Sequence, residues 1–294
     1  MIYCKQILRK EREVWVMDYG SPFYISMIFL LVLVCFLLWF FIRKLSPRMQ
    51  KLAVFLIMII NLLQHLFKWA IYPIYEGQSF NALSTAYNVC ALLIILMPIA
   101  FLSKSRFLRD YVFIAGAFAG FITNVLPFWH IGTPVSELGW EYARFYICHS
   151  LLFFSGMLPL MLGMHKISYR RSPLISLGFL LSICLIIIND IVCIALGIYG
   201  DFTLDGLYEA LYEMNPAMSM HPIESFPILD KIANILTPNV FIPSGNNGVY
   251  VPVLWYAIPA FIGFTLLPFF VIVIVRPKEF FGDLKRLILR SFGK

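Results

Sequence analysis

Long apolar runs place the strongest constraint on what this chain can fold into. Most of them approach or exceed the roughly 20 residues that a helix needs to cross a hydrocarbon core of about 30 Å. The chain is 61% hydrophobic and 13% charged, more apolar than a globular domain can bury. The sequence lacks the alternating pattern of a membrane barrel, so we predict an all-α polytopic transmembrane helical bundle of six to seven spans. The candidate spans are 21–42, 52–72, 85–103, 110–129, 143–164, 173–197 and 250–275.

Charged residues between the spans separate by sign. The segments after the first, third and fifth spans are basic, as is 276–294, whereas the alternate loops 73–84, 130–142 and 198–249 are mainly acidic. Because basic loops stay on the cytoplasmic side, this pattern predicts an outer N-terminus and a cytoplasmic C-terminus. The basic residues of the N-terminal tail break the pattern. The net charge of +7 therefore indicates topology and not nucleic-acid binding.

The domain organisation follows from these loops. We predict an N-terminal tail (1–20), a single transmembrane domain (21–275) with a long outer loop (198–249), and a basic cytoplasmic tail (276–294). Leucines and tyrosines recur at helical spacing over 204–212, which favours an interfacial helix in the outer loop. We expect a multi-pass protein of the plasma membrane. No pattern in the sequence predicts an oligomeric state.

Six cysteines occur, mostly inside the apolar spans and without a CxxC spacing. Neither a disulfide framework nor a zinc ribbon is predicted. A metal site built from Cys90, His149 and Asp190 is conceivable, but no ligand spacing argues for it. We expect no cofactor and no metal, with membrane lipids as partners. The span-end residues His130 and His165 are expected to be solvated.

Polar side chains inside the spans fall at one depth near the outer face. In the second span Asn61, His65 and Lys68 share one helical face, with Gln64 beside it. The other members of this polar layer are Cys90, Asn124, His149, Asn189 and Asp190. Because a charge at the bilayer centre costs at least about 2.5 to 3.5 kcal/mol, Lys68 and Asp190 should face each other, water or a ligand.

Each member of the layer also has a plainer interpretation. Lys68 can snorkel to the outer interface, about one turn away. Asn124 and Asn189 can make ordinary interhelical hydrogen bonds. His149 can be a hydrogen-bonded interior histidine, and Cys90 a small packing residue.

The functional interpretation is covalent acyl chemistry. Cys90 is the candidate nucleophile, His149 its base, and Asp190 the residue that orients the imidazole. Oxyanion donors or substrate contacts would come from the remaining polar side chains near this depth: Tyr87, His65, Lys68, Asn124 and Asn189. On a regular helix Tyr87 shares the face of Cys90, whereas Asn88 points nearly opposite. A phospholipid ester lies near this depth, so we expect a lipid-facing cavity that opens toward the outer leaflet.

Several runs carry a family resemblance. They are Gln64 to Trp69, Ser84 to Leu92 with Pro98, Arg109 to Phe113 with Gly116 and Gly120, and Phe145 to Leu151 with Pro159. Over residues 55–195 the chain resembles the YwaF-like integral membrane family, which is related to the transmembrane protein 164 acyltransferase. The resemblance implies acyl transfer between phospholipids without coenzyme A, with Cys90 as acyl acceptor and His149 as its partner. The family's usual Leu-Pro-Leu-His-Leu-Cys approach to the cysteine is Thr85 to Cys90 here, without the proline and the histidine.

Two other functions fit the same residues. In a transporter or ligand-binding membrane protein, His65, Lys68 and Asp190 would line a polar pathway with water access from both faces. In a structural partner subunit, the outer loop would be the contact surface, although nothing in the sequence identifies a partner.

Overall fold

A computed structural model of the chain describes residues 17–72, 82–127, 130–134, 139–199, 202–223 and 227–292. Most of the N-terminal tail and parts of the predicted outer loops lie outside these residues. The described residues form helices joined by turns, which confirms the predicted all-α bundle. The long helices are α1 (Pro22–Ile42), α2 (Pro47–Leu66), α4 (Val89–Leu102), α5 (Arg106–Val125), α6 (Trp140–Met161), α7 (Ser172–Ala195) and α10 (Leu254–Val275).

Five helical segments of the described chain are long and apolar enough to cross a membrane: Pro22–Ile42, Pro47–Leu66, Trp140–Met161, Tyr169–Ala195 and Leu254–Val275. Large apolar side chains such as Phe29 and Phe41 on α1 point outward, as expected of a lipid-facing surface. The apolar helix α4 has only 14 residues, and α5 begins with charged residues that include Arg106 and Asp110. The count of six to seven complete crossings stays a prediction.

Four predicted spans differ from the helices in the structure by four residues or more at one end or both; those drawn at 110–129 and 250–275 are α5 (Arg106–Val125) and α10 (Leu254–Val275). The span drawn at 52–72 breaks at Phe67, where α2 ends and the single-turn helix α3 (Lys68–Ile71) begins. The span drawn at 85–103 begins only at Val89, because Asn88 is the N-cap of α4 and its side chain accepts the Ala91 N–H at 2.8 Å. Asparagine competes with regular helix by bonding the backbone locally, which favours it at helix starts.

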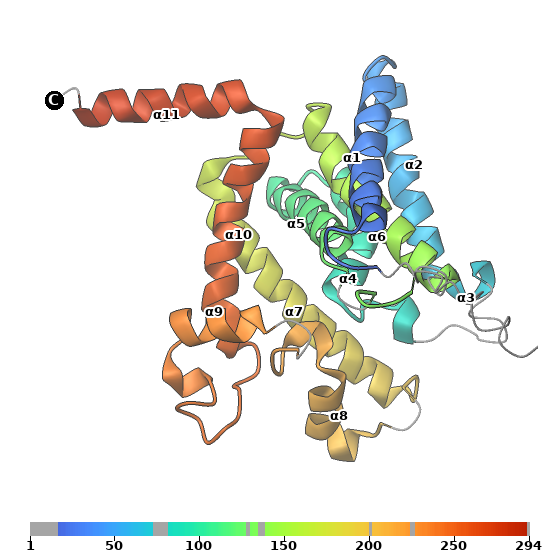
Figure 1. The fold of residues 1–294 in the computed structure, drawn as a ribbon, viewed down its shortest axis with the longest axis vertical. Helices are drawn as coiled ribbons and strands as arrows, with labels where there is room; N and C mark the ends of the chain where they lie inside the picture. Colours follow the sequence, from blue (N-terminus) through green and yellow to red (C-terminus); the bar gives the residue numbers. More distant parts are fainter. Residues whose placement is uncertain are drawn as a thin grey trace, which may run out of the picture.

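The centre of the bundle is the contact between α5 and α6 (Figure 1). A Cβ added to Gly120 would lie 2.4 Å from the Phe153 amide nitrogen and 2.5 Å from the His149 carbonyl oxygen. A Cβ on Gly156 would lie 2.4 Å from the Ala117 amide nitrogen. These two glycines therefore let the helix backbones approach closely, as small residues do between membrane helices.

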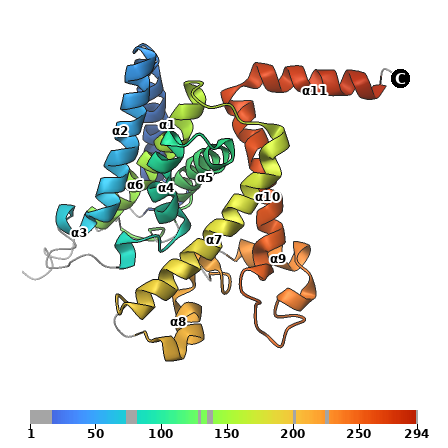
Figure 2. The ribbon, with the colours of Figure 1, turned by 180° about the vertical axis from the view of Figure 1, so that it is seen from behind.

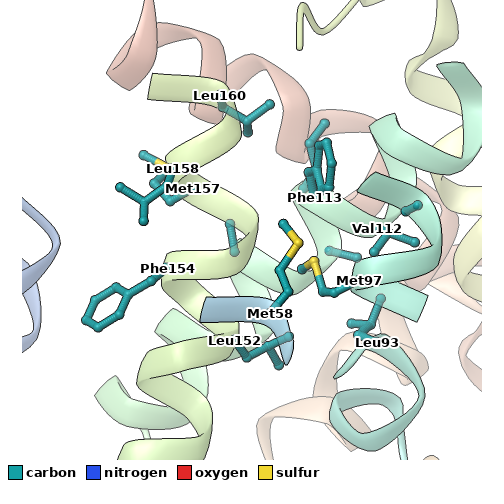
Figure 3. Close-up of a cluster of buried hydrophobic side chains, with 14 of the residues drawn as sticks. Met58, Leu93, Met97, Val112, Phe113, Leu152, Phe154, Met157, Leu158 and Leu160 are labelled. Carbon is teal, nitrogen blue, oxygen red and sulfur yellow. The ribbon is translucent and has the colours of Figure 1, made fainter. Parts of the chain in front are cut away.

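The main apolar core gathers around this contact. Side chains from α2, α4, α5 and α6 meet there, including Met58, Leu93, Phe113 and Leu152 (Figure 3). Helices α1 and α2 lie on one side of the α5–α6 pair, and α7 and α10 on the other, in both views of the ribbon (Figure 2).

The two ends of the bundle have different chemistry. We call the end with the α1–α2 turn, the loop after α6 and the amphipathic helix α11 (Pro277–Phe292) the basic end, and the end with α3, the start of α4 and the short helices α8 (Leu207–Met214) and α9 (Ile228–Leu236) the acidic end (Figure 1). Helix α8 lies where a helix was predicted in the long loop. Helix α11 turns away from α10 and runs out from the bundle (Figure 1).

Candidate functional site

An irregular segment, 82–88, precedes α4 at the acidic end. It contains a 3-10 turn at Ala82–Ser84 and then non-helical backbone up to the N-cap Asn88. Tyr87 therefore does not share a helix with Cys90, so the predicted helical face is wrong. Irregular backbone at membrane depth is tolerated only where protein buries it or where it lines a cavity. The contacts of this segment, which we call the 82–88 segment, define the candidate site.

Side chains of α2 and α3 hold one side of the 82–88 segment. His65 Nε2 lies 3.0 Å from the Thr85 carbonyl oxygen, and the Lys68 ammonium donates to the Leu83 carbonyl. The Lys68 nitrogen also lies 5.2 Å from the centre of the Tyr87 ring, which stacks on His65. Lys68 is only 2% exposed, so it bonds the segment and does not snorkel to the interface.

The polar face of α2 predicted from the sequence is buried as a unit. Gln64 donates to the Asn61 side-chain oxygen at 2.6 Å and accepts from the Tyr72 hydroxyl at 2.7 Å. Asn61, Gln64 and His65 all have buried side chains. This face therefore turns toward the protein interior, as the spacing of these residues indicated.

Side chains of α7 hold the other side of the 82–88 segment. Asn189 Nδ2 donates to the Thr85 hydroxyl at 3.0 Å and to Asp190 Oδ1 at 3.2 Å. The same Asp190 oxygen accepts from the Tyr199 hydroxyl at 2.8 Å. Among the described residues, no ion pair joins Asp190 to Lys68; the two charges lie on opposite sides of the segment and have separate partners.

Cys90 is the second residue of α4. Its Sγ lies 4.0 Å from the Thr123 hydroxyl of α5, and the side chain is half-buried. The Asn88 side chain binds the Ala91 N–H, and the Asn88 carbonyl accepts from Leu92. Within the described part of the chain, the amides of Val89 and Cys90 have no hydrogen-bond acceptor. Such free amides at a helix start carry partial positive charge and stabilise an anion placed against them.

His149 lies on α6, next to the close contact with Gly120. Its Nδ1 is 2.7 Å from the Phe145 carbonyl oxygen. Because a carbonyl can only accept, Nδ1 carries the proton and Nε2 keeps its lone pair, which is the tautomer that a general base needs. In the described structure no hydrogen bond links His149 to Cys90 or to Asp190, so the three predicted catalytic residues do not form a bonded triad.

The neighbour of His149 faces a different direction. Cys148 is buried in the main core, against which Cys90 packs, whereas His149 is only partly buried. Adjacent residues on a helix point about 100° apart, which accounts for the difference.

Asn124 lies one turn beyond Gly120 on α5. Its Nδ2 donates back to the Gly120 carbonyl at 2.8 Å, while its Oδ1 is buried without a partner among the described residues. A buried acceptor without a donor is costly, so this oxygen is a position where a ligand hydroxyl would be stabilised.

Sequence reasoning missed several contacts of the site. Thr85 links the segment to α7, Thr123 lies beside the Cys90 thiol, and Tyr199 holds Asp190. One signal was present: Asn88 before an apolar run is an N-cap pattern that could have placed the helix start. Over the described ranges, His, Cys, Asp and Glu side chains form no group of three that could hold a metal ion.

A second buried polar cluster lies at the basic end. Asp110 Oδ1 accepts from His165 Nε2 at 2.6 Å, and its other oxygen accepts from the Arg171 guanidinium. Arg276 of the α10 end donates to the His165 carbonyl at 3.3 Å. His165 is buried and not solvated, which corrects the sequence-based expectation.

Comparison with known proteins identifies the family. The model of the TMEM164 family matches residues 19–198, which is more than half of the chain. The chain therefore belongs to the TMEM164 family, which confirms the relationship inferred from the Cys90 and His149 runs. No curated protein and no solved structure matches the chain.

Proposed function

We propose that this member of the TMEM164 family is a cysteine-dependent phospholipid acyltransferase or lipid hydrolase that works without coenzyme A. The observation that carries the proposal is the position of Cys90 at the start of α4, where the Val89 and Cys90 amides have no acceptor among the described residues. The two sides of the preceding segment are fixed by hydrogen bonds from α2, α3 and α7. A thiolate and an oxyanion would both be stabilised at this helix start.

The first half-reaction transfers an acyl group to sulfur. His149 Nε2 takes the thiol proton, and the Cys90 thiolate attacks the ester carbonyl of a phospholipid. The oxyanion that forms accepts hydrogen bonds from the Val89 and Cys90 N–H groups, which would act as an oxyanion hole. When the intermediate collapses, the ester C–O bond breaks and the lysophospholipid oxygen takes the proton back from the His149 imidazolium. The product is an acyl thioester on Cys90.

The second half-reaction transfers the acyl group from Cys90 to an acceptor. The hydroxyl of a second lysophospholipid, or water, gives its proton to His149 and attacks the thioester. The C–S bond then breaks, and the departing Cys90 thiolate takes the proton from the His149 imidazolium, which restores the starting enzyme. The unpaired Asn124 oxygen is suited to accept a hydrogen bond from a substrate hydroxyl. His149 and Cys90 are not hydrogen-bonded to each other without substrate, and catalytic contacts commonly close only when a substrate is bound.

The remaining predicted residues receive positioning roles in this proposal. His65, Lys68 and Asn189 bind the 82–88 segment, and Tyr87 packs between His65 and Lys68. Asp190 supports the α7 side through Asn189 and Tyr199. Because these side chains are occupied with one segment, acyl transfer is favoured over a polar pathway lined by His65, Lys68 and Asp190.

The lipid partner and the membrane orientation complete the proposal. The large apolar side chains exposed around the bundle suit a lipid environment. By the charge pattern, the acidic end with Cys90 faces outward and α11 lies at the cytoplasmic face of the plasma membrane. The substrate would then come from the outer leaflet.

The test is lysophospholipid release by the purified protein in micelles that contain a diacyl phospholipid. We expect release by the wild type and none by Cys90→Ala. The matched control is Cys184→Ser, because Cys184 is an exposed thiol on α7, and this variant should retain full activity. Unchanged release by a folded Cys90→Ala variant would contradict the proposed function.

A further inference from the structure

A groove of about 380 Å³ opens at the basic end, far along the bundle from Cys90. It lies between α2, α4, α5 and the turn that follows α6. Its lining combines two cations with apolar side chains: Lys51, Leu52, Phe55, Phe101, Leu102 and Arg109 form most of it. We propose that the groove binds one anionic phospholipid of the leaflet at the basic end, with the headgroup phosphate between Lys51 and Arg109.

The charge of the groove suits a phosphate. In the described structure neither Lys51 nor Arg109 has a carboxylate partner, and the residues that line the groove include no acid. Two cations without counterions at a membrane surface attract anionic lipid headgroups. The acid closest in sequence, Asp110, is occupied by His165 and Arg171.

The Arg109 guanidinium is held in place before any ligand arrives. Its Nε and Nη2 atoms donate to the Ala100 and Phe101 carbonyls at the end of α4, each at 3.3 Å. The Nη1 donors remain for a ligand. Because a fixed guanidinium loses little conformational freedom on binding, this arrangement favours a specific phosphate contact.

The apolar walls suit an acyl chain. The rings of Phe55 and Phe101 stack with centroids 6.0 Å apart and form one wall. Leu52 and Leu102 stand at the rim, and Leu102 is 69% exposed. The groove therefore opens sideways toward lipid as well as toward the headgroup layer, so a whole phospholipid fits its chemistry better than a free phosphate does.

The lining also includes residues of α5 and of the turn after α6. Phe113 and Met164 complete the apolar part, and His165 is buried and bonded to Asp110. A lipid in the groove would bridge α2 and α4 and would rest against the cluster that joins α5 to α7. Lipid binding in the groove does not depend on the acyl chemistry at Cys90, so an experiment can contradict either proposal without contradicting the other.

The test is native mass spectrometry of the full-length protein in detergent with phosphatidylglycerol or with phosphatidylcholine of the same acyl chains. We expect one tightly bound phosphatidylglycerol, and binding about 30-fold weaker in the Lys51→Gln/Arg109→Gln variant, from about 1 kcal/mol per basic contact. The single variant Lys51→Gln removes an exposed side chain and should fold normally while losing roughly fivefold in affinity. Glycerol 3-phosphate in excess should not displace the lipid.

The matched control is Arg48→Gln/Lys104→Gln, which removes the same charge from exposed positions outside the groove. It should bind phosphatidylglycerol like the wild type. Equal losses in both double variants would overturn the proposal in favour of unspecific attraction to the basic end. Equal binding of the two lipids by the wild type, or displacement by glycerol 3-phosphate, would also overturn it.

Discussion

The two buried polar clusters of the bundle contrast in how completely their groups are paired. At the basic end both oxygens of Asp110 are bonded, one to His165 and one to Arg171. At the acidic end the polar side chains of α2, α3 and α7 converge on the 82–88 segment, and two amides of the following helix have no acceptor in the described part of the chain.

The difference separates a structural cluster from a candidate active site. Groups with complete pairing hold helices together and have little left for a ligand. At the acidic end, side chains fix a backbone segment and leave hydrogen-bond donors available at a helix start. These donors are ordered before a ligand binds, so the ligand does not have to order them. Substitutions at the two ends should therefore have different signatures.

The largest expected effect is on stability, at the basic end. Replacing Asp110 with Ala leaves the Arg171 guanidinium and His165 without their shared carboxylate. Removing one partner of a buried ion pair costs about 3 to 5 kcal/mol. Thermal unfolding in detergent should show this loss, whereas Asp283→Ala, which removes an exposed pair with Arg286, should change stability by less than about 1 kcal/mol. Equal stabilities of Asp110→Ala and Asp283→Ala would contradict the stabilising role of the Asp110 cluster.

The next largest effect on stability should come from the close contact between α5 and α6 at the centre of the bundle. Gly120→Ala would place a methyl group 2.4 Å from the Phe153 amide nitrogen and would push α5 away from α6 near His149. Such overpacking costs about 1 to 3 kcal/mol. The control is Gly263→Ala in α10, where nothing lies within 4 Å of the new atom. We expect a lower melting temperature for Gly120→Ala only. An unchanged melting temperature for Gly120→Ala would mean that α5 and α6 are not in close contact at this position.

The smallest stability effect should come from the segment before Cys90. Lys68→Met removes the donor to the Leu83 carbonyl and should cost about 0.5 to 1.5 kcal/mol, the net contribution of one hydrogen bond, because Leu83 is exposed and water can replace the donor. Its main signature should be chemical: a freed segment exposes Cys90, so a membrane-permeant thiol reagent should modify Cys90 faster. Asp110→Ala, measured below its unfolding transition, should not change that rate. The same rate in Lys68→Met and wild type would contradict the positioning role.

The all-α bundle could be predicted from the sequence because the length of an apolar run is a local signal. The polar face of α2 was also predictable, since Asn61, Gln64 and His65 recur at helical spacing and are all buried. The start of α4 was placed too early because the N-cap pattern of Asn88 before an apolar run was not used, and the capping bond to Ala91 shows that the helix begins after Asn88.

The partners within the site could not be read from the sequence. Asp110 meets His165 across 55 positions of the chain, and Asn189 meets Thr85 across 104, so both contacts depend on tertiary packing. The rotation of α6 decides which of its side chains enter the core, where Cys148 is buried, and apolar residues around much of the helix leave that rotation undetermined by the sequence.

The most direct test of the central claim is mass spectrometry of the purified protein after incubation with a defined diacyl phospholipid. We predict a fatty acyl thioester on Cys90 that hydroxylamine removes, present in the wild type and in the control Cys148→Ala, and lost in His149→Ala. No adduct under any lipid condition, together with a Cys90 thiol that membrane-permeant reagents do not modify, would contradict it and would leave Cys90 as a packing residue.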